Sequence, residues 1–130
     1  MSGEPILVVD DNAENLKLAS FILESRGYDV RTASDANEAF AVLRSFHPRM
    51  ILMDLQLPGM DGLAVTRQLK GDPHMREVII IAVTAYAMKG DEQKALGAGC
   101  DGYLAKPIDK AVLLATVNRY LHPESGRPRP

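Results

Sequence analysis

The feature that most constrains the fold is a regular alternation of short apolar runs with longer segments of helical period. Runs rich in Val, Ile, Leu and Met predict strands, and apolar residues spaced three or four positions apart predict helices. The predicted strands are residues 6–9, 28–33, 50–53, 78–83 and 103–105; the predicted helices lie between residues 12 and 27, from 35 through 46, over 63–70 and 91–98, and around 113–120. Strict alternation of this kind predicts an α/β fold, with one open five-stranded parallel sheet and helices on both faces.

Polar residues, glycine and proline mark several of the predicted boundaries. Asn12 is a predicted N-cap, and Gly27 is a stop signal for the same helix. Asp35, with Glu38 three residues later, resembles a capping box that opens the second helix, and Pro48 is expected to end that helix. The helix over residues 91–98 is polar and flanked by glycines, so we expect it to be the least stable of the five.

The charge balance and the single cysteine exclude several classes of protein. The chain carries 15 basic and 17 acidic side chains, a net charge of −2, which gives no electrostatic basis for direct binding to nucleic acid or membrane. Cys100 is the only cysteine, which excludes a disulfide framework and favours a reducing compartment. The longest apolar run, residues 78–83, is much shorter than a membrane span requires. A cytoplasmic location is therefore expected.

The predicted organisation is one domain followed by a tail. Residues 1–122 contain all the predicted strands and helices, without an internal repeat or a domain boundary. The segment 123–130 is rich in Pro and Arg and poor in apolar residues, so we expect it to be disordered.

The residues that can carry chemistry stand where predicted strands end. They are Asp10 and Asp11 after the first strand, Asp54 after the third, Thr84 after the fourth and Lys106 after the fifth. In a parallel sheet the carboxyl ends of the strands lie along one edge, and ligands bind outside that edge at the point where the strand order reverses. If the first and third strands are neighbours there, the three aspartates converge.

Three carboxylates in one crevice repel one another, and a hard divalent cation removes the conflict. Mg²⁺ fits such a site, because it takes oxygen ligands and commonly combines one or two carboxylates with a phosphate oxygen. A carboxylate beside that cation and a lysine is equipped to attack a phosphoryl donor and become an aspartyl phosphate. Asp54 is the predicted nucleophile, because it lies at the centre of the sheet, between the other two aspartates and the side that carries Thr84 and Lys106.

The strand ends also carry five short motifs. They are Val8-Val9-Asp10-Asp11-Asn12, Met53-Asp54, Leu57-Pro58-Gly59-Met60-Asp61-Gly62, Thr84-Ala85 and Tyr103-Leu104-Ala105-Lys106-Pro107. Together they resemble the receiver domain of bacterial two-component response regulators, and the resemblance extends from residue 6 to about residue 121. It implies a flavodoxin-like receiver fold with the strand order 2-1-3-4-5, in which the first and third strands are neighbours.

The resemblance implies a role for each matching residue at the acceptor. Asp54 would be the phosphoacceptor. Asp11, Asp54 and the main-chain carbonyl of Gln56 would ligate Mg²⁺. Asp10 would position the ion, largely through water. Gln56 and Tyr86 stand at positions that vary in the family and affect how fast water removes the phosphoryl group, so the lifetime of the phosphorylated state is left open.

The same resemblance implies a switch beside the acceptor. Lys106 would pair with the phosphoryl group, Thr84 would move toward it, and Tyr103 would turn inward as Thr84 moves. The Lys106–Pro107 bond resembles the family's usual cis peptide. Our own hypothesis is that a downstream protein binds the face formed by the helix over residues 91–98, the fifth strand and the last helix, because this region combines the weakest helix, the aromatic Tyr103 and the loop after Thr84.

As a receiver, the chain would be a response regulator that takes a phosphoryl group from a phosphohistidine of a histidine kinase or a histidine phosphotransfer protein. It would catalyse its own phosphorylation and dephosphorylation, but act mainly as a signalling switch, as a monomer or a weak dimer. Residues 84–91 are similar to the receivers of phosphorelays and hybrid kinases. A stand-alone receiver is favoured by the closeness of Met1 to the first strand; a module of a larger hybrid kinase or regulator stays open. An interaction module of the same fold that is never phosphorylated is a further alternative, although every acceptor residue is intact.

Two other families of related topology fit less well. A flavodoxin-like FMN protein needs a phosphate-cradling Ser/Thr or Gly loop after the first strand, where this chain has two aspartates. A small phosphatase with an aspartate nucleophile needs an Asp-x-Asp sequence after the first strand and a cap domain, and neither is present.

Overall fold

The computed structural model describes residues 3–57, 61–85 and 89–122, in which five strands alternate with five helices. The elements are β1 (Pro5–Val9), α1 (Ala13–Glu24), β2 (Asp29–Ala33), α2 (Ala36–Leu43), β3 (Met50–Asp54), α3 (Gly62–Lys70), β4 (Ile79–Thr84), α4 (Lys89–Ala98), β5 (Gly102–Ala105) and α5 (Lys110–Leu121). Every predicted strand and helix is therefore present, in the predicted order.

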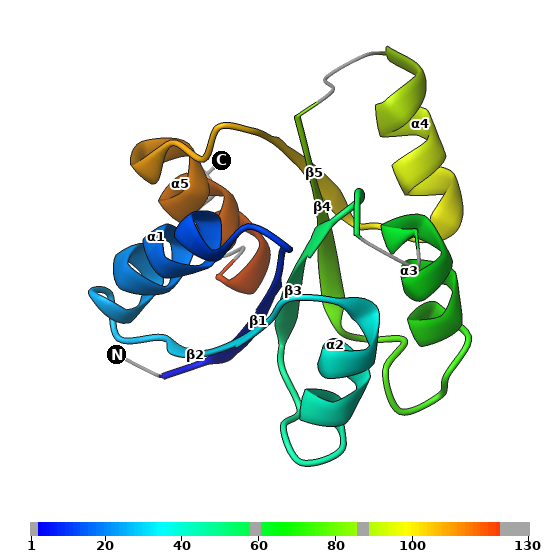
Figure 1. Cartoon of the computed structure of the whole chain (residues 1–130), viewed down its shortest axis with the longest axis horizontal. Helices are drawn as coiled ribbons and strands as arrows, with labels where there is room; N and C mark the ends of the chain where they lie inside the picture. Colours follow the sequence, from blue (N-terminus) through cyan, green and yellow to red (C-terminus); the bar gives the residue numbers. More distant parts are fainter. Residues whose placement is uncertain (1–2, 58–60, 86–88, 123–130) are drawn as a thin grey trace, which may run out of the picture.

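The strands form one parallel sheet with the order β2-β1-β3-β4-β5. This confirms the open α/β fold and the strand order that the family resemblance implied. Helices α1 and α5 cover one face of the sheet, and α2, α3 and α4 cover the other (Figure 1). The order reverses between β1 and β3, which pair directly, with Val9 opposite Met53. The residues that follow these two strands are therefore neighbours.

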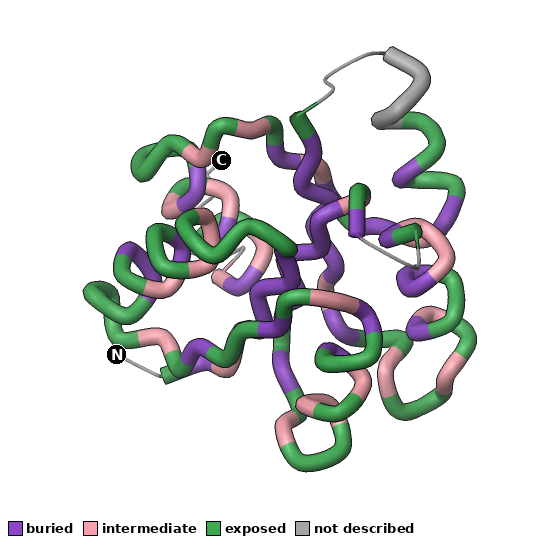
Figure 2. Tube along the Cα trace, viewed as in Figure 1, coloured by how far each residue is buried: buried purple, intermediate pink, exposed green. Residues whose placement is uncertain are grey.

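The central strands are apolar at nearly every position because both faces of the sheet are covered. Alternate side chains of a strand point to opposite faces, so each strand contributes to two core layers. The layer under α2, α3 and α4 includes Leu7, Val9, Ile51, Met53, Ile80 and Ala82. The layer under α1 and α5 includes Ile6, Val8, Met50, Leu52, Ile81 and Val83. Figure 2 shows the buried residues concentrated along the strands, which makes the sheet a rigid support for the strand ends.

The helix starts follow the predicted caps. The Asn12 side chain accepts two backbone N–H groups from the first turn of α1. The Asp35 side chain accepts the N–H of Glu38 at the start of α2, as in a capping box. The Glu38 carboxylate, however, accepts hydrogen bonds from Ser34 rather than from the N–H of the cap residue.

The predicted end of the second helix at Phe46 is wrong, because α2 ends at Leu43. The N–H groups of Arg44 and Ser45 donate to carbonyls three residues back, which is a tighter turn than the α-helix. Pro48 lacks an N–H, and its ring clashes with a helical carbonyl four residues earlier, so the α-helix cannot continue up to it. Phe46 packs half-buried against the core from the following loop.

Three sequence-based expectations concern residues outside the described ranges: the tail 123–130, the motif residues 58–60 and the side chain of Tyr86. In the part of the chain that the structure describes, no helix combines the length and the apolar character needed to cross a membrane.

Candidate functional site

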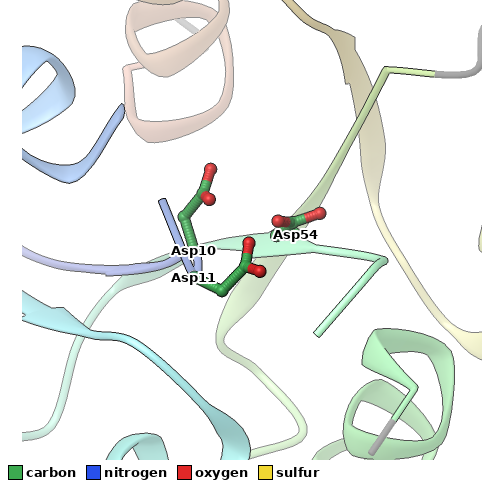
Figure 3. Close-up of side chains that lie close together, drawn as sticks. All are labelled: Asp10, Asp11 and Asp54. Carbon is green, nitrogen blue, oxygen red and sulfur yellow. The ribbon is translucent and has the colours of Figure 1, made fainter. Parts of the chain in front are cut away.

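Three aspartate side chains meet at the carboxyl edge of the sheet. Asp10 and Asp11 follow β1, and Asp54 is the last residue of β3. Each offers one carboxylate oxygen, and these oxygens lie within 4.8 Å of one another. Figure 3 shows Asp11 extending from the end of β1 toward Asp54. Asp10 and Asp54 are buried, whereas Asp11 is exposed, so the cluster is open to solvent on the Asp11 side.

The first turn of α1 holds Asp10 in place. Asp10 Oδ1 accepts the N–H of Asn12 at 2.9 Å, and Oδ2 accepts from Nδ2 of Asn15 at 3.3 Å. The N–H of Asp10 donates to the carbonyl of Ala33 at 3.0 Å, which ties it to the end of β2. Sequence reasoning missed Asn15; its place in the first turn after the Asn12 cap was the available signal.

The Asp54 carboxylate is 1% exposed and is held from two sides. Oδ1 accepts the N–H of Gln56 at 2.9 Å, which folds the chain tightly after β3. Oδ2 accepts from the Lys106 ammonium at 3.0 Å. Both carboxylate oxygens therefore have a hydrogen-bond donor, as a buried ionised group requires.

Lys106 bridges the two buried carboxylates. Its Nζ lies 3.0 Å from Asp54 Oδ2 and 3.2 Å from Asp10 Oδ2. The sequence predicted a lysine on the Thr84 side of the acceptor; the structure shows that its ammonium also reaches the β1 side. The N–H of Lys106 donates to the carbonyl of Thr84 at 2.8 Å, and the bond to Pro107 is cis, as the resemblance implied.

Burial and pairing shift the pKa of both partners. Burial raises the pKa of the Asp54 carboxyl above its ordinary value and the charge of Asp10 adds to this, although the hydrogen bonds from Gln56 and Lys106 oppose it. Burial on its own would lower the pKa of the Lys106 ammonium. The hydrogen bond and charge of Asp54, together with those of Asp10, outweigh burial and raise that pKa. The ammonium therefore stays charged at neutral pH.

The predicted switch residues lie on β4, which pairs with the acceptor strand β3, and on β5, which pairs with β4. Thr84 is the last residue of β4, is 2% exposed, and pairs with Ala105 of β5. Tyr103 of β5 is half-buried and packs beside the core under α2, α3 and α4. The structure places Thr84 at the same edge of the sheet as Asp54, and Tyr103 opposite Ala82, within β5. The movement of both residues stays a prediction.

The donor set of this cluster fits a hard divalent cation. Among the side chains that the structure describes, three carboxylates and one ammonium leave an excess of two negative charges, which one divalent ion would balance. Carboxylate oxygens are the ligands that Mg²⁺ prefers, and the solvent-exposed Asp11 leaves room for the water ligands that Mg²⁺ usually keeps. The same arrangement offers a buried carboxylate flanked by positive charge, which suits attack on a phosphoryl group.

Comparison with known proteins points to one family. A family model described as the response regulator receiver domain matches residues 6–118. The polar-differentiation response regulator DivK of Brucella ovis is 42% identical over 116 residues, which cover 89% of this chain and 94% of DivK.

Solved structures agree with the sequence comparison. The receiver domain of sensor histidine kinase PA1611 from Pseudomonas aeruginosa PAO1, solved with a magnesium ion coordinated in its active site cleft, is 38% identical with a TM-score of 0.83. That similarity covers 92% of this chain and 98% of the PA1611 domain. The chemotaxis response regulator CheY4 of Vibrio cholerae is 27% identical with a TM-score of 0.86, covering 91% of this chain and 98% of CheY4.

Proposed function

Because the chain belongs to the family of response regulator receiver domains, we propose that it accepts a phosphoryl group on Asp54 and thereby changes which proteins it binds. Receiver domains are the response modules of two-component signal transduction, so the chain acts in a pathway of that kind. The proposed donor is a phosphohistidine on a histidine kinase or a histidine phosphotransfer protein. A cytoplasmic location is part of the proposal and suits the free thiol of Cys100.

One observation supports this function most strongly. Asp54 is a buried carboxylate 3.0 Å from an ammonium, and its neighbours at the point of strand-order reversal are two further carboxylates. A cluster of three carboxylates, two of them buried, is costly to maintain, and structural stability alone gives no reason to keep it. Binding of a cation and a phosphoryl group at this edge would account for the presence of the three carboxylates.

The proposed step is a direct phosphoryl transfer. A carboxylate oxygen of Asp54 forms a bond to phosphorus as the bond from phosphorus to the donor's imidazole nitrogen breaks. The electron pair of the broken bond stays on the imidazole, which takes up a proton from solvent. Lys106 already donates to Asp54 Oδ2, so its ammonium can pass to a phosphoryl oxygen as negative charge moves there.

Mg²⁺ is the proposed cofactor. Asp11, Asp54 and the main-chain carbonyl of Gln56 would hold it. Asp10 would position it. Bound there, the ion would neutralise charge on the phosphoryl oxygens and reduce repulsion among the carboxylates. The carboxylate cluster supports this proposal, as does the magnesium ion in the cleft of the similar PA1611 receiver domain.

The proposed effector surface is the face formed by α4, β5 and α5. Leu96 of α4 is 49% exposed and Val112 of α5 is 51% exposed. Large apolar side chains at the surface are suited to protein contact. Thr84 ends β4, which pairs with β5, so a movement of Thr84 toward a phosphoryl group on Asp54 would disturb the strand that carries Tyr103.

Intact-mass spectrometry tests the acceptor. After incubation with acetyl phosphate and Mg²⁺, the wild type should gain one phosphoryl group, and EDTA should suppress the reaction. The Asp54→Asn variant should gain none. The Asp72→Asn variant is a matched control, because Asp72 lies between α3 and β4, at the opposite edge of the sheet, and it should react like the wild type. An unlabelled wild type would instead favour an interaction module that is never phosphorylated.

Amide chemical shifts test the effector surface. Beryllofluoride with Mg²⁺ imitates a bound phosphoryl group, and the resulting shift changes should extend from Asp54 over β5 and α5. Changes confined to the site and to α1 and α2 would contradict the proposed surface, even if Asp54 is the acceptor.

A further inference from the structure

We propose that Gly62 is a positioning residue for Asp54, an inference that rests on the proposed function. Gly62 is buried and begins α3. Its N–H donates to the carbonyl oxygen of Leu55 at 3.2 Å, which closes the base of the loop between β3 and α3. The start of α3 is thus anchored to the residue that follows the acceptor.

No side chain fits at Gly62 without a movement of backbone. A Cβ there would lie 2.8 Å from Cα of Leu55 and 3.1 Å from the carbonyl carbon of Asp54, and closer still to the carbonyl oxygen of Asp54. All three are backbone atoms, so neither a rotamer change nor a flexible side chain can relieve the overlap. Gly62 has no positive φ, which means that space, and not backbone conformation, requires glycine here.

The peptide between Asp54 and Leu55 is held from both sides. On one side, the N–H of Leu55 donates to the carbonyl of Val83 at 3.1 Å, which continues the pairing with β4. On the other side, Gly62 packs directly on this peptide. The fully buried Thr66 fixes Gly62 in turn, because its Oγ1 donates to the Gly62 carbonyl at 2.9 Å.

The position of this peptide decides the geometry of the carboxylate cluster. The carboxylate oxygens of Asp10, Asp11 and Asp54 come from two strands and lie within 4.8 Å of one another, so a shift of the Asp54 backbone changes these separations together. Asp54 Oδ1 also accepts the N–H of Gln56 at 2.9 Å, so the same shift would displace the proposed carbonyl ligand. Ligand and nucleophile positions matter to within about 1 Å in such sites.

The Gly62→Ala variant tests this role with three measurements. In the metal-free protein, the amide chemical shifts of Asp54, Leu55 and Gln56 should change. Calorimetric titration with Mg²⁺ should show an affinity about 10-fold to 100-fold weaker than wild type, the range seen when residues that orient metal ligands are replaced. The rate of phosphorylation by acetyl phosphate should fall by a similar factor.

Two controls separate positioning from helix stability. Gly71→Ala makes the same substitution at the other end of α3, where a Cβ would come no closer than 3.4 Å to its neighbours, and it should behave like the wild type. Leu69→Ala removes a buried side chain from the same helix and should lower thermal stability without changing Mg²⁺ affinity. Equal losses of Mg²⁺ affinity in Leu69→Ala and Gly62→Ala would overturn the proposal, because stability of α3 would then explain both.

If Gly62→Ala does not fold, the Thr66→Val variant tests the same positioning role. It preserves the side-chain shape but removes the hydroxyl that fixes Gly62, and it should give a smaller loss of Mg²⁺ affinity with shift changes at Asp54 and Gln56. Unchanged shifts and affinity in the folded variant would refute the positioning role. A wild type that is never phosphorylated would refute the proposed function instead. The amide chemical shifts of Asp54, Leu55 and Gln56 in metal-free Gly62→Ala would still show whether Gly62 positions the Asp54 backbone.

Discussion

Asp11 is the exposed member of the carboxylate cluster, and its replacement by Ala separates two effects of its charge. Without metal, its carboxylate is close to two like charges, on Asp10 and Asp54, and the ammonium of Lys106 offsets only part of the repulsion. With Mg²⁺, the same carboxylate becomes a proposed ligand. Asp11→Ala should therefore stabilise the metal-free protein and weaken its response to Mg²⁺.

The size of the repulsion follows from the separation of the oxygens. Two unit charges 4.8 Å apart interact by about 0.9 kcal/mol at the dielectric constant of water and about 3.5 kcal/mol at an effective value near 20. Asp11 is exposed, so we expect a stabilisation of about 1 kcal/mol, which for a domain of this size raises Tm by about 3–5 °C. At Mg²⁺ concentrations about 100 times the wild-type Kd, bound metal adds about 2.7 kcal/mol to the wild type. A variant that binds about 100-fold more weakly gains about 0.4 kcal/mol, so the order of stability reverses.

Thermal unfolding followed by circular dichroism, in EDTA and in a series of Mg²⁺ concentrations, measures this reversal. Calorimetry supplies the two Mg²⁺ affinities. Glu77→Ala is a suitable control, because Glu77 is an exposed carboxylate before β4, at the opposite edge of the sheet, and its replacement should leave the response to Mg²⁺ unchanged. If Asp11→Ala is less stable than wild type in EDTA, its charge does not destabilise the metal-free cluster; if it binds Mg²⁺ as tightly as wild type, Asp11 is not a ligand.

Other variants test the buried charges and the switch. Burial raises the pKa of Asp54 in the folded protein above its pKa in the unfolded chain. Between these two pKa values the folded protein binds more protons than the unfolded chain, so the free energy of unfolding falls as pH rises from the lower value to the higher one. Urea unfolding in EDTA at several pH values should show this fall in the wild type, whereas Asp54→Asn should lack it and be more stable at neutral pH. Lys106→Met leaves two buried carboxylates without their ammonium and should cost about 2–4 kcal/mol in the same assay; equal stability would show that the pairing is not needed. Thr84→Ala and Tyr103→Ala should still accept phosphate but lose most beryllofluoride-dependent shifts on α5, and full shifts in both would rule out their role in the switch.

Most of the fold could be predicted because its main determinant is local. Short apolar runs in the sequence predict buried parallel strands, and apolar residues three or four positions apart predict helices. The end of α2 was missed because Pro48 affects the turn that precedes it, which shortens the helix to Leu43. Pairing of β1 with β3 joins segments more than forty residues apart in sequence, and it was available only from the family resemblance.

Some features of the site could also be predicted from the sequence, and others depend on contacts between distant segments. The strand pattern placed Asp10, Asp11 and Asp54 along one edge of the sheet, and the family resemblance, which made β1 and β3 neighbours, predicted that they cluster. The contact of Lys106 with Asp10 could not, since it depends on how far a side chain at the end of β5 reaches across β4 and β3 to β1. The close approach of Gly62 to the Asp54 peptide likewise depends on the angle at which α3 meets the sheet, and only the glycine itself is visible in the sequence.

Chemical trapping locates the phosphoryl group and so tests directly whether Asp54 is the acceptor. Borohydride reduces an acyl phosphate to an alcohol, so a reacted aspartate carries a permanent mark that peptide mapping by tandem mass spectrometry can find. After incubation with acetyl phosphate and Mg²⁺, we expect reduction at Asp54 alone, and none when EDTA is present. Reduction at Asp10 or Asp11 with Asp54 intact would show that Asp54 is not the acceptor.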